Sequence, residues 1–347
     1  MYSFLQLILE LTESVSAPGL SWSIEYIDAI NAEILSVCGE ESTVFDQLIL
    51  DSVSGSHRTR AVIAMLWCEA ISGDYLSAVP IAAAYEVAHA AALVEDDIID
   101  ESREKHGSNT LSVKYGIPRA LLVSNALLFY APTFIAKSAR LSEDSILVAR
   151  LLDLLGNCGR LTARGEFLDL EMSQMSEVSV PIYEKMITMK TGALVGAASA
   201  SGALVGMKEF DSLVFEAAYS FGESLGAAYQ ILDDLQDYLG EADQMGKPSM
   251  TDLRNRKISL PIIACLQKAD QADRDFLKTT LVSHSPISTN EAERTKSLIL
   301  HYGADKYCRA EASKFVTKAE ASLSKLNENS SAKQRLAETI QFLSTRN

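Results

Sequence analysis

Residues 75–101 read YLSAVPIAAAYEVAHAAALVEDDIIDE, an alanine-rich run that ends in a group of carboxylates. Alanine is the strongest helix former, and Pro80 stands near the start of the run, where a helix tolerates proline. The run therefore predicts a long helix whose C-terminal end carries acidic side chains.

The same helical pattern continues on both sides of this run. Residues 21–37 (SWSIEYIDAINAEILSV) place most of their large apolar side chains on one stripe of a helix. Alternating Val, Ile and Thr runs, which are typical of strands, do not recur, and no Ser/Gly linker divides the chain. We expect one all-α domain over residues 1–347, a tight bundle of roughly ten to thirteen helices.

Charge and composition exclude several classes of protein. The net charge of −15 argues against nucleic-acid binding and against docking on anionic lipid. We expect no stable membrane insertion, because by this interpretation no apolar run reaches membrane-spanning length. We expect no signal peptide, because residues 1–14 lack a basic start. Five scattered cysteines without a CxxC pair favour a reduced, cytoplasmic chain.

The acidic group at the end of the opening run occurs twice in the chain with the same spacing. The two groups are Asp96, Asp97 and Asp100, and then Asp233, Asp234 and Asp237. In each group the first and third aspartates are four residues apart, so on a helix they point within about 40° of each other. Both groups follow apolar residues, which places them on helices with apolar walls.

Stacked carboxylates repel each other and therefore need a cation. Mg²⁺ suits them, because it is commonly bound by one or two carboxylates together with phosphate oxygens of a substrate. One such group alone is as easily a solvated acidic face, but two on apolar helices favour a metal-diphosphate site. Basic residues near the groups support this interpretation: Arg58 and Arg60, Lys190, and Lys247, Arg254, Arg256 and Lys257.

With these motifs in order, the sequence resembles the trans-isoprenyl diphosphate synthases, the polyprenyl synthetase family, from about residue 22 to Arg346. The blocks that carry the resemblance are ExxH before DDxxD (Glu86, His89, Asp96), GxxxDL (Gly165 to Leu170), KTG (Lys190) and GxxxQxxDDxxD (Gly226 to Asp237).

The resemblance implies an all-helical isoprenoid synthase fold with a central cavity, and a prenyltransferase that joins isopentenyl diphosphate to an allylic prenyl diphosphate. It implies roughly three Mg²⁺ ions per site, held directly by Asp96, Asp100 and Asp233 and directly or indirectly by Asp97, Asp234 and Asp237. Lys190, Lys247 and Lys257 would bind the departing diphosphate, and Thr191 and Gln230 would stabilise the allylic cation. Family members commonly form dimers through N-terminal helices, so we expect a homodimer.

This chain departs from the family pattern at the isopentenyl diphosphate site. GSHRTR (55–60) has His57 where the family has lysine, although Arg58 and Arg60 remain. Lys105, His106 and Gly107 replace RRG, Glu95 replaces histidine before the first motif, and Glu166 replaces glutamine. Lys and His bind phosphate less specifically than a bidentate arginine. Either the synthase has altered affinity, or the site has decayed and the chain cyclises or transfers one allylic diphosphate.

Two further alternatives stay open. The chain could be a catalytically quiet subunit of a heteromeric synthase, although its acidic motifs are intact. His89 could contact a phosphate from the helix before the first motif, or it could be an ordinary core histidine.

The side chains before the first motif bear on product length. Ala92, Ala91 and Ala88 are small, and the first large side chain on that face is Tyr85, eleven residues before Asp96. That separation corresponds to about 16 Å of helix, enough for roughly a farnesyl tail and a product of about twenty carbons or more. Phe129 and Tyr130 on the next helix could close the cavity sooner, or the alanines could simply let two helices pack closely.

Overall fold

The structure, a computed structural model, describes residues 21–344 except 40–42, 55, 106–107, 143, 176, 241–249, 284 and 327–329. At residues 105, 137–142 and 343–344 only the backbone is described.

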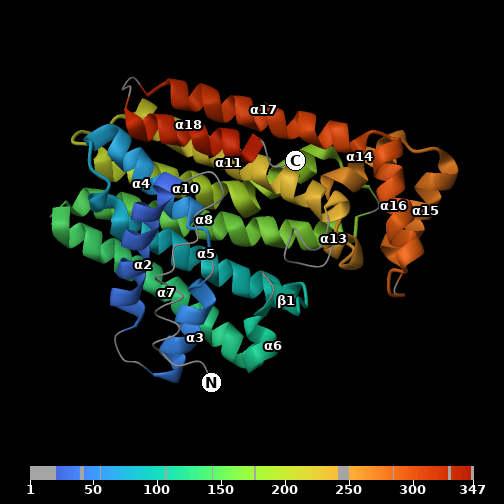
Figure 1. The fold of residues 1–347 in the computed structure, drawn as a ribbon, viewed down its shortest axis with the longest axis horizontal. Helices are drawn as coiled ribbons and strands as arrows, with labels where there is room; N and C mark the ends of the chain where they lie inside the picture. The colour runs from blue at the N-terminus through green and yellow to red at the C-terminus, as the bar shows by residue number, and fades with distance from the viewer. Residues whose placement is uncertain are drawn as a thin grey trace.

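The described residues form an all-helical bundle (Figure 1). Its N-terminal part contains η1 (Ser21–Ser23), α2 (Ile24–Cys38), α3 (Val44–Val53), α4 (Thr59–Ser72), η2 (Leu76–Ala78), α5 (Val79–Ile99), α6 (Leu111–Tyr115), α7 (Ile117–Ser142) and α8 (Ser145–Met172). Then follow α9 (Val180–Ile187), η3 (Thr188–Gly192), α10 (Ala193–Gly206), α11 (Ser212–Leu239), α13 (Thr251–Arg254), α14 (Leu260–Lys268), α15 (Gln271–Val282), α16 (Thr289–His301), α17 (Ala304–Ser324) and α18 (Ser331–Ser344).

This element list confirms the predicted fold class. Among the described residues, α6 and α13 are very short, and α9, η3 and α10 form one continuous helical rod. If the short helices are left out and the rod is counted once, the described residues contain thirteen helices, the upper end of the expected range. The one described sheet is a two-residue antiparallel pair, β1 (Glu104–Lys105) with β2 (Ser108–Asn109), where Glu104 faces Asn109. It lies in the turn after the first acidic group.

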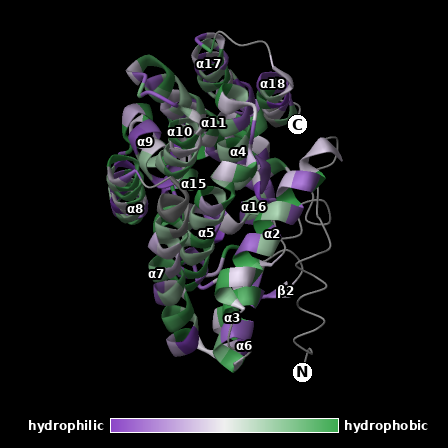
Figure 2. Ribbon diagram, turned by 90° about the vertical axis from the view of Figure 1, so that its left-hand side faces the viewer, coloured by the Kyte–Doolittle hydropathy of each residue, from purple (hydrophilic) through white to green (hydrophobic). Residues whose placement is uncertain are grey.

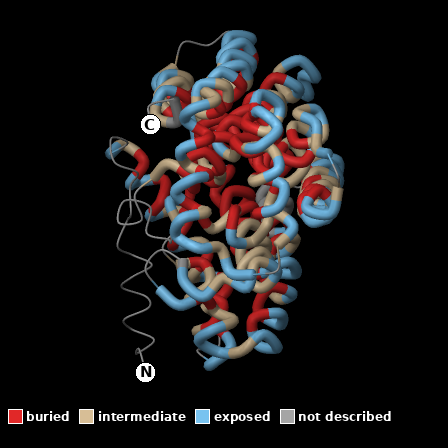
Figure 3. The backbone as a smooth tube through the Cα atoms, turned by 90° about the vertical axis from the view of Figure 1, so that its right-hand side faces the viewer, coloured by how far each residue is buried: buried red, intermediate tan, exposed pale blue. Residues whose placement is uncertain are grey.

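The core is centred on α10, which is apolar or small on all sides and has thirteen of its fourteen residues buried. Its small residues let neighbouring backbones come close: a Cβ on Gly202 would lie 1.9 Å from the Ala64 carbonyl oxygen of α4. The hydropathy colouring and the burial colouring show the same apolar, buried centre (Figures 2 and 3). The core cluster runs from Tyr26 to Ile340, although the single-domain organisation of residues 1–347 stays a prediction.

Two helical stretches, Leu76–Ile99 and Ile117–Ala136, are long and apolar enough to cross a membrane by length and composition. This corrects the expectation that no run reaches that length. The first stretch is 72% buried within the protein, and its alanine-rich sequence has the hydropathy of a core helix. The second stretch, in α7, is 39% buried.

The rod formed by α9, η3 and α10 contains an irregularity that bears on function. Its five residues Thr188–Gly192 form a π-helical turn, and such turns are frequent at functional sites. The turn packs against both α8 and α11. Gly165 of α8 permits this contact, because a Cβ there would lie 2.3 Å from the Lys190 amide nitrogen.

Candidate active site

The first acidic group lies at the C-terminal end of α5. Asp96 and Asp97 belong to its last turn, and Asp100 caps it. The second group lies in the last two turns of α11. A helix C-terminus carries partial negative charge, so carboxylates are unfavourable there unless a cation compensates them.

Lys190 supplies such a cation. Its Nζ atom lies 2.6 Å from Glu166 Oε2, 2.9 Å from Asp169 Oδ2 and 3.4 Å from Asp96 Oδ1. Burial alone would lower the pKa of Lys190, but the charges of Asp96, Asp169 and Glu166 outweigh burial and raise it. The ammonium group of η3 therefore joins the acidic ends of α5 and α8.

Lys257 makes a second link of the same kind. Its Nζ atom lies 2.6 Å from Asp100 Oδ2 and 3.9 Å from Asp169 Oδ2. Burial and the nearby Lys190 lower the pKa of Lys257, whereas Asp96 and Asp100 raise it, and the net shift is upward. For Asp100, burial raises the pKa, and the charge of Lys257 works against that rise.

Asp237 fastens the segment that carries Lys257 to α11. The Met250 amide donates to the Asp237 carbonyl oxygen at 2.8 Å, and the Asp252 amide donates to its Oδ2 atom at 2.9 Å. Asn255 of the same segment donates to the Asp100 carbonyl oxygen at 3.4 Å. Residues 250–257 thus connect the ends of α11 and α5, and the two acidic groups lie on either side of them.

Asp234 is buried and holds a chain of hydrogen bonds. It accepts from Tyr183 Oη at 2.6 Å and from Gln230 Nε2 at 2.7 Å, and Gln230 Oε1 accepts from Thr191 Oγ1 at 2.7 Å. Burial raises the pKa of Asp234 to about 7, and the hydrogen bonds from Tyr183 and Gln230 oppose that rise. Asp234 therefore lies where it orients Gln230.

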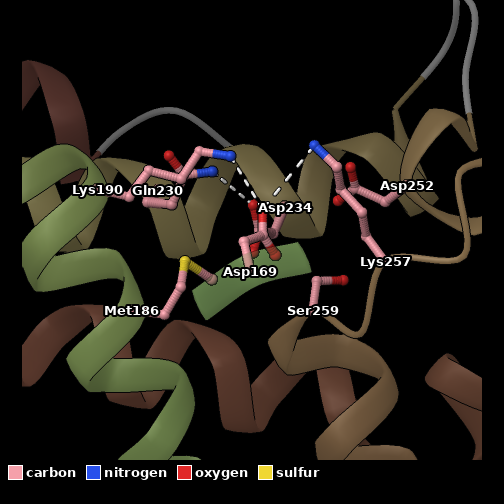
Figure 4. A pocket seen from close by; sticks show the side chains of 8 residues that line it. All are labelled: Asp169, Met186, Lys190, Gln230, Asp234, Asp252, Lys257 and Ser259. Carbon is pink, nitrogen blue, oxygen red and sulfur yellow. Dashed lines mark hydrogen bonds and ion pairs between the residues drawn. The ribbon is translucent and has the colours of Figure 1, made fainter. Parts of the chain in front are cut away.

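These side chains surround one pocket (Figure 4). Its lining comes from α8, α9, η3, α11, α13 and the segment after α13: Asp169, Met186, Lys190, Gln230, Asp234, Asp252, Lys257 and Ser259. Charged and amide groups from elements far apart in sequence thus face the same small space.

The donor set suits Mg²⁺. Carboxylate oxygens are hard ligands, and the ammonium groups beside Asp96 and Asp100 already show that cations are stable there. No three His, Cys, Asp or Glu side chains of the described residues are arranged to hold a metal by themselves. This is expected of an ion whose shell is completed by phosphate oxygens.

The basic residues predicted to bind diphosphate differ in exposure, and two of them are not fully described. His57 is exposed, whereas His89 and Arg60 are half-buried. The Nε atom of Arg60 is buried without a hydrogen-bond partner among the described residues, and burial lowers the pKa of Arg60 while Glu86 opposes this. Lys247 lies outside the described residues, and the Lys105 side chain, at the β1 end, is not described.

Arg58 is engaged within the protein. Its side chain is 3% exposed, its Nε atom donates to Asn31 Oδ1 at 2.9 Å, and it lies 3.7 Å from Glu86 Oε2. Glu86 also accepts from the Ala61 amide at 3.2 Å, at the start of α4. Arg58 therefore fastens the turn before α4 to α2 and α5, which argues against its role as a diphosphate ligand.

The predicted chain-length residues lie on α5. Ala88 and Ala91 are buried, Ala92 is half-buried, and Tyr85 is fully buried with its Oη atom 2.8 Å from Ser201 Oγ of α10. Phe129 is 77% exposed, so the expectation that it closes a cavity in this chain is wrong. Its helix turns that side chain to the surface.

Sequence reasoning missed residues in the pocket and directly behind it. Asp169 and Tyr183 received no role, although each contacts a predicted site residue. The signal for Asp169 was its position three residues after Glu166, which places both on one helical face. For Tyr183 no local signal existed, because its partner is 51 residues away.

Comparisons with known proteins identify the family of this chain. The sequence matches the polyprenyl synthetase family over residues 42–299. It is 28% identical over 328 residues to a short chain isoprenyl diphosphate synthase of Methanothermobacter thermautotrophicus, covering 90% of this chain and 98% of that protein. It is 31% identical over 240 residues to a geranylgeranyl diphosphate synthase of Mycobacterium tuberculosis, covering 69% of this chain and 67% of that protein.

A solved polyprenyl synthase of Caulobacter crescentus, complexed with calcium and isoprenyl diphosphate, has the same fold. Its TM-score is 0.85 at 24% identity, with 94% of this chain and 96% of that chain covered. The chain belongs to the polyprenyl synthetase family. Within that class it is an isoprenyl diphosphate synthase, a trans-prenyltransferase, and its family uses a divalent metal to bind diphosphate substrates.

Proposed function

We propose that this protein condenses isopentenyl diphosphate with an allylic prenyl diphosphate, in the presence of Mg²⁺, to give a linear trans-prenyl diphosphate of about twenty carbons or more. The observation that carries the proposal is the convergence of Lys190 and Lys257 with carboxylates of α5 and α8 beside Thr191 and Gln230. The relatives named above are synthases, which favours a synthase over a cyclase.

The reaction begins when the allylic C–O bond breaks and its electron pair goes to the diphosphate. Lys190 and Lys257 exchange their carboxylate partners for oxygens of the departing diphosphate and stabilise its charge. Bound Mg²⁺, roughly three ions held by Asp96, Asp100 and Asp233 with help from the other aspartates of the two groups, would add to that electrostatic stabilisation.

The allylic cation then requires stabilisation and protection from water. Thr191 is 8% exposed and donates its proton to Gln230, so lone pairs of both side-chain oxygens can face the cation. The double bond of isopentenyl diphosphate attacks the cationic carbon, and the proton lost from the adduct passes to the departed diphosphate. Apolar walls exclude water, which would otherwise quench the cation.

Arg60 is the side chain that we assign to the isopentenyl diphosphate. Its buried Nε–H group has no acceptor among the described residues, and a phosphoryl oxygen would supply one. His57 and His89 would add contacts to the diphosphate. We expect weaker binding of isopentenyl diphosphate than with the lysine that the family has at position 57.

We propose that one face of α5 determines the product length. This face carries Ala88, Ala91 and Ala92 between the acidic group and Tyr85. The prenyl tail would run along these alanines until the Tyr85 ring stops it.

We also propose a homodimer in the cytoplasm. α7 exposes a stripe of large apolar side chains on one face: Ile117 (52%), Leu121 (43%), Leu122 (61%), Leu128 (46%) and Phe129 (77%). A second copy of the chain would cover this stripe. All five cysteines are buried free thiols, which suits a reducing compartment.

The test is incubation of the purified chain with Mg²⁺, labelled isopentenyl diphosphate and allylic diphosphates of increasing length. We expect labelled products whose size, after dephosphorylation and chromatography, is about twenty carbons or more, and no product from Asp96→Asn. Calorimetry with isopentenyl diphosphate in the presence of an allylic analogue separates the alternatives. Absence of binding at millimolar ligand would overturn the synthase assignment and favour a cyclase or a quiet subunit.

A further inference from the structure

Tyr183 is linked through Asp234 to Gln230, the side chain that would face the allylic cation. It is fully buried on α9, and its hydroxyl donates to Asp234 Oδ2 at 2.6 Å. Building on the proposed function, we propose that Tyr183 is a positioning residue: through Asp234 it fixes the side-chain amide of Gln230 so that the amide oxygen faces the allylic cation.

The hydrogen bonds determine which way the side-chain amide of Gln230 faces. Gln230 Nε2 donates to Asp234 Oδ1 at 2.7 Å, and Thr191 Oγ1 donates to Gln230 Oε1 at 2.7 Å. When Asp234 is ionised, its carboxylate only accepts hydrogen bonds, so the nitrogen of the amide faces Asp234 and the oxygen faces Thr191. If the amide turned over, its N–H groups would face the cation and repel it.

Asp234 can hold the amide only if the carboxylate itself is held. It is 6% exposed, and the hydrogen bonds from Tyr183 and Gln230 engage one oxygen each. Without the Tyr183 hydroxyl, the Oδ2 atom would lose its partner and the carboxylate could rotate. The four side chains come from α9, η3 and α11, so the chain of bonds also fixes the π-turn relative to α11.

The test is Tyr183→Phe, which removes one oxygen atom and keeps the ring. We expect kcat to fall about tenfold while KM for both substrates stays within about twofold, because the lost interaction acts on the cation and not on the bound diphosphates. Tyr26→Phe is the matched control: Tyr26 is equally buried and hydrogen-bonded to Glu69, far along the chain from the site. It should leave kcat unchanged.

A second variant and a direct measurement complete the test. Asp234→Asn can present either an acceptor or a donor to Gln230, and it also removes a carboxylate that helps to hold Mg²⁺. It should therefore lower kcat by at least the same factor. In the double variant the two losses should not multiply, because both act through one chain of bonds. The ¹⁵N side-chain signal of Gln230, assigned by its disappearance in Gln230→Glu, should lose protection from hydrogen exchange in Tyr183→Phe.

The outcomes are separable. An inactive wild-type enzyme would overturn the proposed function, whereas the exchange measurement would still test the hydrogen-bond chain. An active wild-type enzyme with an unchanged kcat in Tyr183→Phe would overturn the positioning role. A rise in both KM values with unchanged kcat would also overturn it, because it would show a role in diphosphate binding.

Discussion

Glu166 is one of the residues at which the sequence departs from the family pattern. It places a third carboxylate near the Lys190 ammonium, at 2.6 Å, where the family has an uncharged amide. Lys190 must leave these carboxylates to bind diphosphate. We therefore expect Glu166→Gln to bind inorganic diphosphate with Mg²⁺ roughly three- to tenfold more tightly, as measured by calorimetry.

Glu171→Gln is the control for that variant, because Glu171 is exposed on the same helix. It removes the same charge without touching Lys190. Equal affinities in both variants would show that general charge, and not the Lys190 contact, determines diphosphate binding.

Tyr85 provides a second test at the residue scale. Tyr85→Ala should lengthen the products, because the residues beyond it on the side away from the acidic group, Ala82–Ala84, are also small. It should cost about 3–5 kcal/mol of stability because it opens a core cavity. Chromatography of the products and thermal unfolding measure the two effects. Tyr85→Phe should keep the product length; an unchanged length in the alanine variant would show that the tail does not end at Tyr85.

The residues of the site were predictable to the extent that they are local in sequence. The four-residue spacing of the aspartates and the lysine of KTG are visible in short stretches. The engagement of Arg58 with Asn31 and Glu86 and of Asp234 with Tyr183 joins separate helices, and only the packed structure shows it.

At the scale of elements, the contact between α8 and η3 sets the position of Lys190. A Cβ on Gly165 would meet Lys190 backbone at 2.3 Å, and backbone cannot yield as a flexible side chain can. Gly165→Ala should therefore push the two elements apart and lower kcat by about a hundredfold, since a displacement of about 1 Å can have that effect. Steady-state kinetics measures it, and circular dichroism checks the fold.

Two other glycines of α8 serve as controls. A Cβ on Gly156 or Gly159 would meet nothing within 4 Å. Alanine at either position should preserve kcat and raise helix stability by roughly 0.5–1 kcal/mol. Loss of activity in these controls would mean that α8 responds to any added methyl group.

The elements themselves were largely predictable, because apolar periodicity and alanine content decide helix type over long stretches. The π-turn was not, because one extra residue in a helical turn leaves hardly any trace in the pattern. It forms where η3 packs against both α8 and α11, which is a tertiary effect.

At the scale of the whole molecule, the apolar stripe of α7 bears on assembly. Phe129→Glu places a charge on the most exposed side chain of the proposed dimer contact and should convert the protein to monomers in light scattering. Val282→Glu is the control, because Val282 is 72% exposed on α15, away from the stripe. A monomeric wild-type protein, or a dimeric Phe129→Glu variant, would contradict the proposed contact.

Composition predicted the class of the whole molecule well. A chain with a net charge of −15 that handles diphosphates must concentrate cations locally, and both pocket lysines lie among carboxylates. The exposed face of α7 could not be predicted in the same way, because an apolar helix has the same sequence pattern whether it lies inside a bundle or between two copies of a chain.

The ammonium groups of Lys190 and Lys257 neutralise part of the carboxylate charge of the site, so the folded protein does not depend on metal ions alone for this. Folding and metal loading should therefore be separable, and a chelator such as EDTA should abolish turnover while shifting the melting temperature by only about 1–2 °C, as expected for less than about 1 kcal/mol. Replenished Mg²⁺ should restore full turnover without refolding. A large drop in melting temperature on chelation would show that the ammonium groups do not replace the metal.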